Sequence, residues 1–261
     1  MIDLHCHILP KLDDGPDIVT ESVDMCKQAI ADGTTDIVAT PHFFDGHHDV
    51  NLEVRDIYLK KINLFLHQSG LPLRLHAGAE VRLVPKLGKL LRNPHRLCIN
   101  QSRYMLIELP SVIPQTLEQE LYDLQLIGCV PILAHPERYE YIQRNPDFLL
   151  HLASSGVLGQ ITAQSLLGGF GEKCRRCAEL LVHNRTAHFV ASDAHSSSAR
   201  PPLLAAARAR IEHIAGHIEA RAMFEERPRA VLRNRPVSIQ SPLPSTPRTI
   251  SDLVERLATL L

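Results

Sequence analysis

Histidine and carboxylate side chains stand at the ends of short apolar runs at six places in the chain. Each run is short enough for one β-strand, and each ends in a residue type that binds divalent cations. If the strands run parallel in a barrel, their carboxyl ends meet at one face and bring nitrogen and oxygen ligands together. The sequence therefore predicts a metal centre with ligands for more than one ion. The runs end in His5 and His7, in His42, in Glu80, in Glu108, in His135, and in Asp193 with His195.

The first and last of these runs carry two candidate ligands each. His5 and His7 stand two residues apart, so on a strand both side chains point to the same face. One histidine there could be a hydrogen-bonded core residue, but two on one face just before a loop favour metal ligation. Asp193 and His195 repeat this spacing. Asp14 lies in a turn soon after His7, where turn formation alone explains an aspartate and the nearness of His7 makes it a candidate ligand.

Two carboxylates and two arginines complete the candidate site. Glu80 and Glu108 end apolar runs, where a buried carboxylate without a partner is costly. A bound cation relieves that cost, and so does an arginine, so both explanations stay open. Arg138 and Arg200 follow two ligand-bearing strands. They could be ordinary surface arginines, but their position favours phosphate binding, because a guanidinium fork matches phosphate oxygens.

The segments that would position these residues alternate between apolar strands and stretches with helical periodicity. This alternation predicts a parallel sheet. A seven-unit barrel gathers all the candidate ligands, whereas an open sheet gathers ligands only near its switch point. We expect strands over 1–7, 36–42, 73–80, 104–108, 130–135, 157–162 and 188–195, and helices over 21–31, 51–68, 84–91, 114–127, 145–155, 171–183 and 202–215.

The overall composition narrows the class of protein. The chain has 261 residues and a net charge of −1, from 28 basic and 29 acidic residues. This balance gives no electrostatic basis for nucleic acid as a main partner. The sequence contains no signal-peptide pattern and no apolar run of about 18 residues, so we expect a cytoplasmic protein without membrane insertion. Six cysteines without disulfide-framework spacing fit a reducing compartment.

Other catalytic motifs are incomplete or absent. Cys174 and Cys177 form a single C-x-x-C pair, which is a weak zinc signal without a second pair. The Gly-Gly-Phe-Gly turn at 168–171 lacks the lysine and serine of a phosphate-cradling loop. No cysteine is followed six positions later by arginine, and no G-x-S-x-G motif occurs. The sequence therefore argues against a cysteine-dependent phosphatase and against a serine hydrolase of that type.

The end of the chain differs in composition from the rest. We expect the barrel to occupy residues 1–235 and a Pro- and Ser-rich linker to occupy residues 236–248. A short helix is expected over 249–261, with an apolar stripe that docks on the barrel or on a neighbouring subunit.

These motifs together resemble the polymerase and histidinol phosphatase superfamily. More narrowly, they are similar to the bacterial metal-dependent tyrosine phosphatases of capsule and exopolysaccharide gene clusters. The similarity runs from residue 1 to about residue 202. The motifs that carry it are His5-Cys-His7, Asp14-Gly15, Thr40-Pro-His42, Glu80, Glu108, His135-Pro-Glu-Arg138, Gln160-Ile-Thr-Ala163, Ser165-Leu-Leu-Gly168 and Ser192-Asp-Ala-His195.

The resemblance implies an α/β fold with a distorted seven-stranded (β/α)7 TIM-like barrel. It also implies three divalent metal ions, with manganese as the expected metal and iron, zinc or magnesium as alternatives. Carried over by position, the three ligand sets are His5, His7, Glu80 and Asp193; Asp14, His42 and His195; and Glu80, Glu108 and His135. Arg138 and Arg200 would bind the substrate phosphate.

The resemblance further implies a protein-tyrosine phosphatase. Its expected partner is a bacterial tyrosine kinase with a phosphorylated, tyrosine-rich tail that regulates polysaccharide assembly. One alternative is a phosphatase of the same superfamily that acts on histidinol phosphate or another small molecule. The other alternative is a metal-stabilised interaction module without catalytic turnover.

Overall fold

Nine short strands, all paired in parallel, form the frame of the molecule, which a computed structural model describes over residues 1–48 and 50–244. They form a three-stranded sheet in the order β1-β2-β4 and a six-stranded sheet in the order β3-β5-β6-β7-β8-β9. The strands are β1 (Ile2–Cys6), β2 (Asp36–Ala39), β3 (His42–Phe43), β4 (Arg74–Ala77), β5 (Glu80–Arg82), β6 (Tyr104–Glu108), β7 (Val130–Ala134), β8 (Leu158–Thr162) and β9 (Phe189–Ala191).

Two of the seven predicted strands are each interrupted near the carboxyl end. Thr40 and Pro41 separate β2 from β3, and Gly78 and Ala79 separate β4 from β5. Proline has no backbone N–H for the ladder, and a Cβ on Gly78 would meet the Thr40 side chain at 3.2 Å. The first halves belong to the smaller sheet and the second halves to the larger one. The breaks distort the barrel but keep its seven-strand order, which confirms the predicted fold class.

The barrel closes between its first and last strands. Cys6 at the end of β1 forms a parallel bridge with Ala194, just after β9. His7 N–H donates to the Ala194 carbonyl at 2.8 Å, and Asp193 N–H donates to the His5 carbonyl at 2.8 Å. Closure therefore takes place through the residues that flank the predicted ligands.

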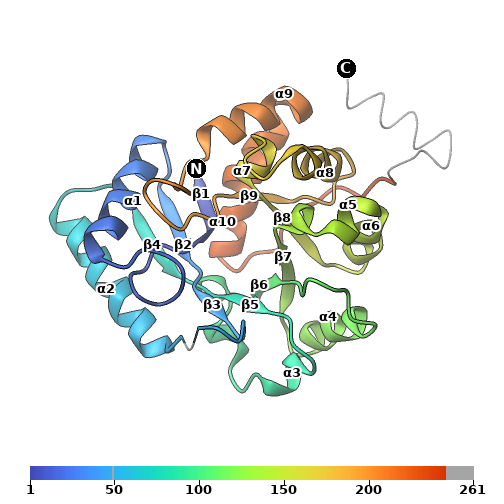
Figure 1. The fold of residues 1–261 in the computed structure, drawn as a ribbon, viewed down its shortest axis with the longest axis horizontal. Helices are drawn as coiled ribbons and strands as arrows, with labels where there is room; N and C mark the ends of the chain where they lie inside the picture. Colours follow the sequence, from blue (N-terminus) through green and yellow to red (C-terminus); the bar gives the residue numbers. More distant parts are fainter. Residues whose placement is uncertain (49, 245–261) are drawn as a thin grey trace.

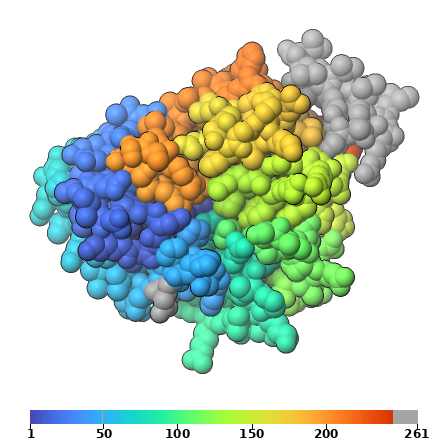
Figure 2. Space-filling model, viewed as in Figure 1, coloured from blue at the N-terminus to red at the C-terminus, as the bar shows by residue number. Residues whose placement is uncertain are grey.

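Helices surround the strands in chain order (Figure 1), and the chain colours follow the same order around the space-filling view (Figure 2). All seven predicted helices are present, with ends that differ by a few residues. They are α1 (Val19–Ala31), α2 (Leu52–Gln68), α3 (Leu87–Leu90), α4 (Leu117–Leu126), α6 (Asp147–Ser154), α8 (Glu172–His183) and α9 (Ala205–Arg221). Short helical segments that we did not predict are η1 (Pro94–Arg96), η2 (Ile99–Gln101), η3 (Pro136–Arg138), α5 (Glu140–Arg144), α7 (Ala163–Leu166), η4 (Ala222–Glu226) and α10 (Arg227–Leu232).

Alternate strand positions contribute to two different apolar layers. Leu106 of β6 and Phe189 of β9 pack with Val231 of α10 in one cluster. Their strand neighbours Ile107 and Val190 pack in a second cluster with residues of the surrounding helices. Because successive side chains on a strand point to opposite faces, the first layer fills the barrel and the second joins it to the helices. This double-sided burial explains the nearly continuous apolar runs.

The predicted tail is described only in part. Residues 236–244 have no regular secondary structure, and Leu243 N–H donates to the Asn184 carbonyl at 2.8 Å. The rest of the predicted linker and the helix predicted over 249–261 lie outside the described residues. Within 1–48 and 50–244, no helix has the length and apolar character needed to cross a membrane.

Candidate metal centre

The carboxyl end of β1 supplies the innermost side chains of the site. His5 and His7 are buried, and their Nε2 atoms lie 3.1 Å apart. The outer ring nitrogen of each imidazole is held in place: His5 Nδ1 lies 2.8 Å from Gln160 Oε1, and His7 Nδ1 lies 2.6 Å from Asp13 Oδ2. Both Nε2 atoms are thus aimed at the same point, which is how second-sphere partners orient metal-ligating histidines.

Glu80 lies at the centre of these imidazoles. It begins β5 directly after the Gly78 break, and its side chain is buried. Its Oε2 lies 3.3 Å from the Nε2 atoms of both His5 and His7. Its Oε1 accepts at 2.7 Å from His135 Nε2. One carboxylate therefore contacts imidazoles from β1 and from the end of β7.

A second group of side chains lies beside His7. Asp14 Oδ1 is 3.2 Å from His195 Nε2 and 3.5 Å from His42 Nε2. The His7 and His195 rings stack with centroids 4.0 Å apart. The Asp14 side chain is 52% exposed, so this group faces the barrel mouth.

Glu108 joins the site from the end of β6. One of its oxygens, a nitrogen of His42 and an oxygen of Glu80 all lie within 4.8 Å of one another. Glu108 also forms an ion pair of 2.8 Å with Arg82. Both partners that the sequence left open for this carboxylate, an arginine and a cluster of metal-ligating atoms, are therefore nearby.

Two of the predicted ligands have strained backbones. His135 has φ of 35° and Asp193 has φ of 51°, in the left-handed region that residues with a Cβ rarely adopt. The strand β9 ends at Ala191, so the strand-parity argument for Asp193 and His195 is wrong. Asp193 nevertheless lies 3.4 Å from His5 Nε2. Left-handed residues of this kind cluster at functional sites, where the surrounding structure holds the strain.

The described residues contain three groups of side-chain atoms that could hold a metal ion. They differ from the sets implied by the family resemblance in three ways. His7 joins the second set, Glu80 is absent from the first, and His42 takes the place of His135 beside Glu80 and Glu108. His135 belongs to none of the three groups, although its Nε2 lies 2.7 Å from Glu80 Oε1. The predicted assignment of ligands to individual ions stays a prediction. The groups are His7, Asp14, His42 and His195; His5, His7 and Asp193; and His42, Glu80 and Glu108.

Unpaired buried atoms test whether this site fits cations. Glu80 Oε2, His42 Nδ1 and His135 Nδ1 are buried and have no hydrogen-bond partner in the described structure. Glu80 Oε2 and His42 Nδ1 lie 3.1 Å apart, without hydrogen-bond geometry. Leaving such groups unsatisfied is costly. Divalent ions would satisfy the carboxylate and unprotonated imidazole nitrogens, so the residues fit a metal centre.

The protonation of the cluster follows from its charges. Burial alone lowers the pKa of His7, but Asp13 and Glu80 outweigh this effect and raise it to about 10. Burial likewise lowers the pKa of His42, and the nearby carboxylates of Asp14 and Glu80 raise it to about 11. Burial raises the pKa of Glu80, yet the surrounding histidines hold it well below its usual value. Protons on imidazoles therefore balance the carboxylates when no cation is bound.

Arg138 and Arg200 meet at Asp193. Arg138 Nη1 donates to Asp193 Oδ2, and Arg200 Nη2 lies 2.6 Å from the same oxygen. Both guanidinium groups lie over the ring of Phe170, with Cζ-to-centroid distances of 4.5 Å for Arg138 and 5.6 Å for Arg200. Two arginines from different loops are thus placed next to the ligand cluster.

Sequence reasoning missed several residues that support the site. Asp13 accepts from His7 and from the His42 N–H at 3.1 Å, whereas the sequence pattern indicates only Asp14 as a candidate ligand. Asp3 is buried in β1, and it accepts from the Ser192 hydroxyl at 2.5 Å and the Ser192 N–H at 3.0 Å. Apart from the turn signal at Asp13, only spatial contact identifies these roles.

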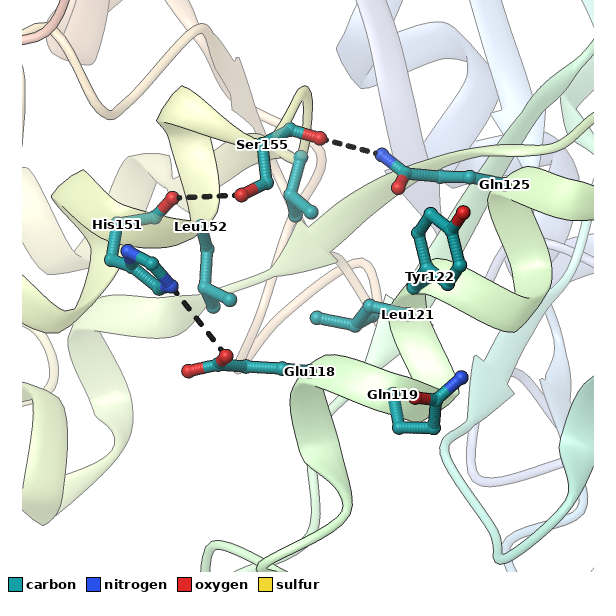
Figure 3. A pocket seen from close by; sticks show the side chains of 9 residues that line it. Glu118, Gln119, Leu121, Tyr122, Gln125, His151, Leu152 and Ser155 are labelled. Atoms are coloured by element: carbon teal, nitrogen blue, oxygen red, sulfur yellow. Dashed lines mark hydrogen bonds and ion pairs between the residues drawn. The ribbon is translucent and has the colours of Figure 1, made fainter.

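A hollow elsewhere on the molecule can be set aside. It lies between α4 and α6, has a volume of about 250 Å³, and is shown in Figure 3. Glu118 and His151 in its wall are 3.5 Å apart, and the Gln125 side chain donates to the Ser155 carbonyl at 2.8 Å. None of its lining residues belongs to the three groups of metal-ligating atoms.

Comparison with known proteins gives a consistent result. A family model described as capsular polysaccharide synthesis, CpsB/CapC, matches residues 1–233. CapC of Staphylococcus aureus is 42% identical over 205 residues, which cover 78% of this chain and 80% of that protein. The tyrosine-protein phosphatase YwqE of Bacillus subtilis is 37% identical over 246 residues, which cover 94% and 96% of the two chains.

Solved structures agree with these matches. One comes from the crystal structures of YwqE from Bacillus subtilis and CpsB from Streptococcus pneumoniae, described as unique metal-dependent tyrosine phosphatases. It has a TM-score of 0.88 and 35% identity, and the match covers 95% of this chain and 100% of that chain. Histidinol phosphate phosphatase from Lactococcus lactis, with a TM-score of 0.52, 13% identity, and coverage of 86% and 96%, shares the fold.

Proposed function

The chain belongs to the CpsB/CapC family of capsular polysaccharide synthesis and is a metal-dependent tyrosine-protein phosphatase, and we propose that it acts on a bacterial tyrosine kinase. In this proposal the substrate is the phosphorylated, tyrosine-rich tail of a kinase that controls capsule or exopolysaccharide synthesis. Three divalent ions, with manganese as the physiological metal, occupy the ligand cluster.

The convergence of two arginines on Asp193 carries the proposal. Asp193 Oδ2 binds both guanidinium groups, while Asp193 Oδ1 faces His5 Nε2 at 3.4 Å. A phosphoryl group bound by Arg138 and Arg200 would therefore lie directly beside the ligand cluster. Guanidinium forks match phosphate oxygens in geometry and charge.

The protein's own residues account for binding and charge stabilisation. Arg138 and Arg200 would hold the equatorial oxygens of the phosphoryl group and stabilise the charge that spreads over them during transfer. His5, His7, Glu80 and Asp193 would hold cations at the buried end of the site. Bound divalent ions lower the pKa of water and polarise a phosphoryl group. All six cysteines are buried, which argues against a cysteine nucleophile.

The leaving group explains a preference for phosphotyrosine. A phenol has a pKa of about 10, so it can leave as an oxide with little protonation. An alkyl alcohol, such as that of phosphoserine or histidinol phosphate, needs more help from a general acid. Asp14 is about half exposed and Arg200 is partly exposed, so the mouth is open to solvent. A flexible kinase tail would reach this mouth more easily than a loop of a folded phosphoprotein.

The substrate assignment can be tested by comparing kcat/KM at matched manganese concentration. We expect phosphotyrosine peptides, including the kinase tail, to be hydrolysed much faster than phosphoserine peptides or histidinol phosphate. Chelation should abolish turnover, and adding manganese should restore it. A preference for histidinol phosphate would overturn the tyrosine assignment. Full turnover by verified metal-free protein would overturn the metal mechanism. If no phosphoester were hydrolysed at all, the protein would be a metal-stabilised interaction module without catalytic activity.

The phosphate-binding role can be tested with arginine variants. Arg138→Ala and Arg200→Ala should each reduce turnover by on the order of 10²-fold, because each removes one charge-stabilising group. Their metal content should stay near that of the wild type. Arg144→Ala is a matched control, because Arg144 is 75% exposed and pairs with Glu140 instead. Normal kinetics in both site variants would mean that Arg138 and Arg200 are surface arginines.

A further inference from the structure

The loops after three adjacent strands bring one aromatic ring against both arginines. Arg138 lies in η3 after β7, Phe170 follows α7 after β8, and Arg200 lies in the loop after β9. These strands are neighbours in the sheet. In Figure 2 the yellow segment after β8 and the orange segment after β9 lie side by side. The Phe170 ring therefore contacts two phosphate-binding candidates.

From this arrangement we propose that Phe170 is a positioning residue for Arg138 and Arg200. The inference rests on the proposed function, because it requires that these arginines bind the substrate phosphate. The Cζ atoms lie 4.5 Å and 5.6 Å from the ring centroid, within the range of a cation–π contact. The uncharged ring contacts both guanidinium groups and leaves the positive charge of each one intact.

The geometry of a cation–π contact explains why an aromatic side chain suits position 170. A guanidinium that lies over an aromatic face contacts the ring with its flat surface. Its N–H donors stay in the guanidinium plane and remain free for phosphate oxygens. Asp193, the other common partner, consumes donors from both arginines and is also a predicted metal ligand. Phe170 can therefore keep both arginines in place when Asp193 is engaged elsewhere.

The glycine-rich turn at 168–171 explains how the ring is presented. Gly168 and Gly171 have φ of 83° and 87°, which favours glycine at both positions. Gly169 N–H donates to the Gln164 carbonyl at 2.8 Å, and Gly171 N–H donates to the Gly168 carbonyl at 2.9 Å. This motif lacks the side chains of a phosphate-cradling loop, and its three glycines instead shape a tight turn that projects Phe170.

The turn is also tied to the segment that carries Arg138. The Ser165 hydroxyl in α7 donates to Glu137 Oε1 at 2.6 Å, and Thr162 N–H donates to the same oxygen at 2.9 Å. Glu137 is fully buried and directly precedes Arg138. The ring and its nearer guanidinium are therefore attached to one hydrogen-bonded unit, which fixes their relative position.

The test measures phosphate binding in variants that separate ring character from size. Inorganic phosphate serves as a competitive inhibitor of aryl phosphate hydrolysis by the manganese-loaded full chain. Phe170→Ala and Phe170→Leu should raise the inhibition constant of phosphate on the order of 10-fold, as expected for loss of two cation–π contacts. Phe170→Tyr keeps the aromatic face and should stay close to the wild type. Metal content should be unchanged in all three.

Leu167→Ala is the matched control, because Leu167 is the C-cap residue of α7 in the same loop region as Phe170, is 50% exposed and has no aromatic face. It should leave phosphate inhibition and turnover unchanged. Wild-type phosphate inhibition in Phe170→Leu would overturn the inference. A higher KM for the aryl substrate with an unchanged inhibition constant for phosphate would also overturn it. The ring would then contact the substrate rather than position the arginines.

The arginine variants keep the two proposals distinct. Impaired phosphate binding in Arg138→Ala and Arg200→Ala, together with a normal Phe170→Leu variant, would refute only the positioning role. Normal phosphate binding in both arginine variants would refute the phosphate site itself. If Phe170→Ala does not fold, the Leu and Tyr variants still decide, because both keep a large apolar side chain at this position.

Discussion

Metal binding should release protons from the site, and the number of protons follows from the charges around two histidines. In the metal-free protein the pKa of His7 is about 10 and that of His42 is about 11. Both imidazoles are therefore protonated at neutral pH. A metal ion binds only the unprotonated ring nitrogen. Loading the site near pH 7.5 should displace about two protons.

The sign and size of the pH dependence follow from this count. Below pH 10, raising the pH reduces the competition from protons and strengthens metal binding. With about two protons displaced, the apparent affinity for complete loading should rise roughly 100-fold per pH unit between pH 7 and 9. Burial lowers the pKa of His5, but Glu80 and Asp193 raise it overall, so His5 is a further source of protons and the count of about two from His7 and His42 is a minimum. The pKa of His195 is lowered by burial and by His7, so His195 does not.

Titration calorimetry with manganese in several buffers measures this release directly. The slope of the observed enthalpy against the ionisation enthalpy of the buffer gives the number of protons. Asp13→Asn should lower that number by about one, because the charge and hydrogen bond of Asp13 are the main forces that raise the pKa of His7. Asp36→Asn is a matched control, since Asp36 pairs with His76 at 2.8 Å rather than with a site residue.

The reasoning fails if the wild-type protein binds manganese near pH 7.5 without proton release. It also fails if metal affinity does not change between pH 7 and 9. Either result would mean that the imidazoles are already neutral in the metal-free protein, and that something other than protonated histidines compensates the negative charge of Glu80.

Two further predictions concern the barrel itself. Phe189 is fully buried in the layer that fills the barrel. Phe189→Ala should therefore lower the free energy of unfolding, measured by urea denaturation, by roughly 3–5 kcal/mol. A loss well below this range would mean that neighbouring side chains move in and fill the cavity. Gly159→Ala should cost roughly 1–3 kcal/mol, because its new methyl group would meet the Thr186 carbonyl oxygen. Gly88→Ala meets nothing closer than 3.5 Å, and equal losses in the two glycine variants would contradict the steric argument.

Much of the fold could be predicted because the relevant signals are local. Short apolar runs indicate the strands, including the two that contain Pro41 and Gly78, and His5 and His7 share a face through simple alternation. The breaks at these same residues were not predicted. A sequence marks a proline or glycine, but whether the strand resumes in another sheet depends on which neighbours it pairs with.

Helix faces illustrate a second limit of sequence patterns. Arg55 in α2 is only 2% exposed, although arginine normally marks a solvent-facing position. Its guanidinium donates to the carbonyls of Gly78 and Arg96, each at 2.9 Å, and pairs with Asp56. The two carbonyl partners come from distant segments, so the pattern of α2 alone gives no sign of them.

The candidate ligands were predictable, whereas their supports were not. A histidine at a strand end can be read from the sequence, but the residue that orients it depends on the closed barrel. Gln160 contacts His5 from 155 positions away. Phe170 belongs to a turn whose glycines are visible in the sequence, yet its two arginine partners come from the loops on either side.

The closure of the barrel between β1 and β9 sets the order in which the site can form during synthesis. A nascent chain that has emerged through β8 already carries every predicted ligand except Asp193 and His195. At typical elongation rates, roughly 10 to 40 seconds separate the appearance of His5 from that of His195. Once β8 has emerged, β1 and β8 each present an unpaired edge until β9 follows, and such edges promote aggregation. The ribosome must therefore release nearly the whole barrel before the metal centre can be completed, so metal loading is a late step in the maturation of this protein.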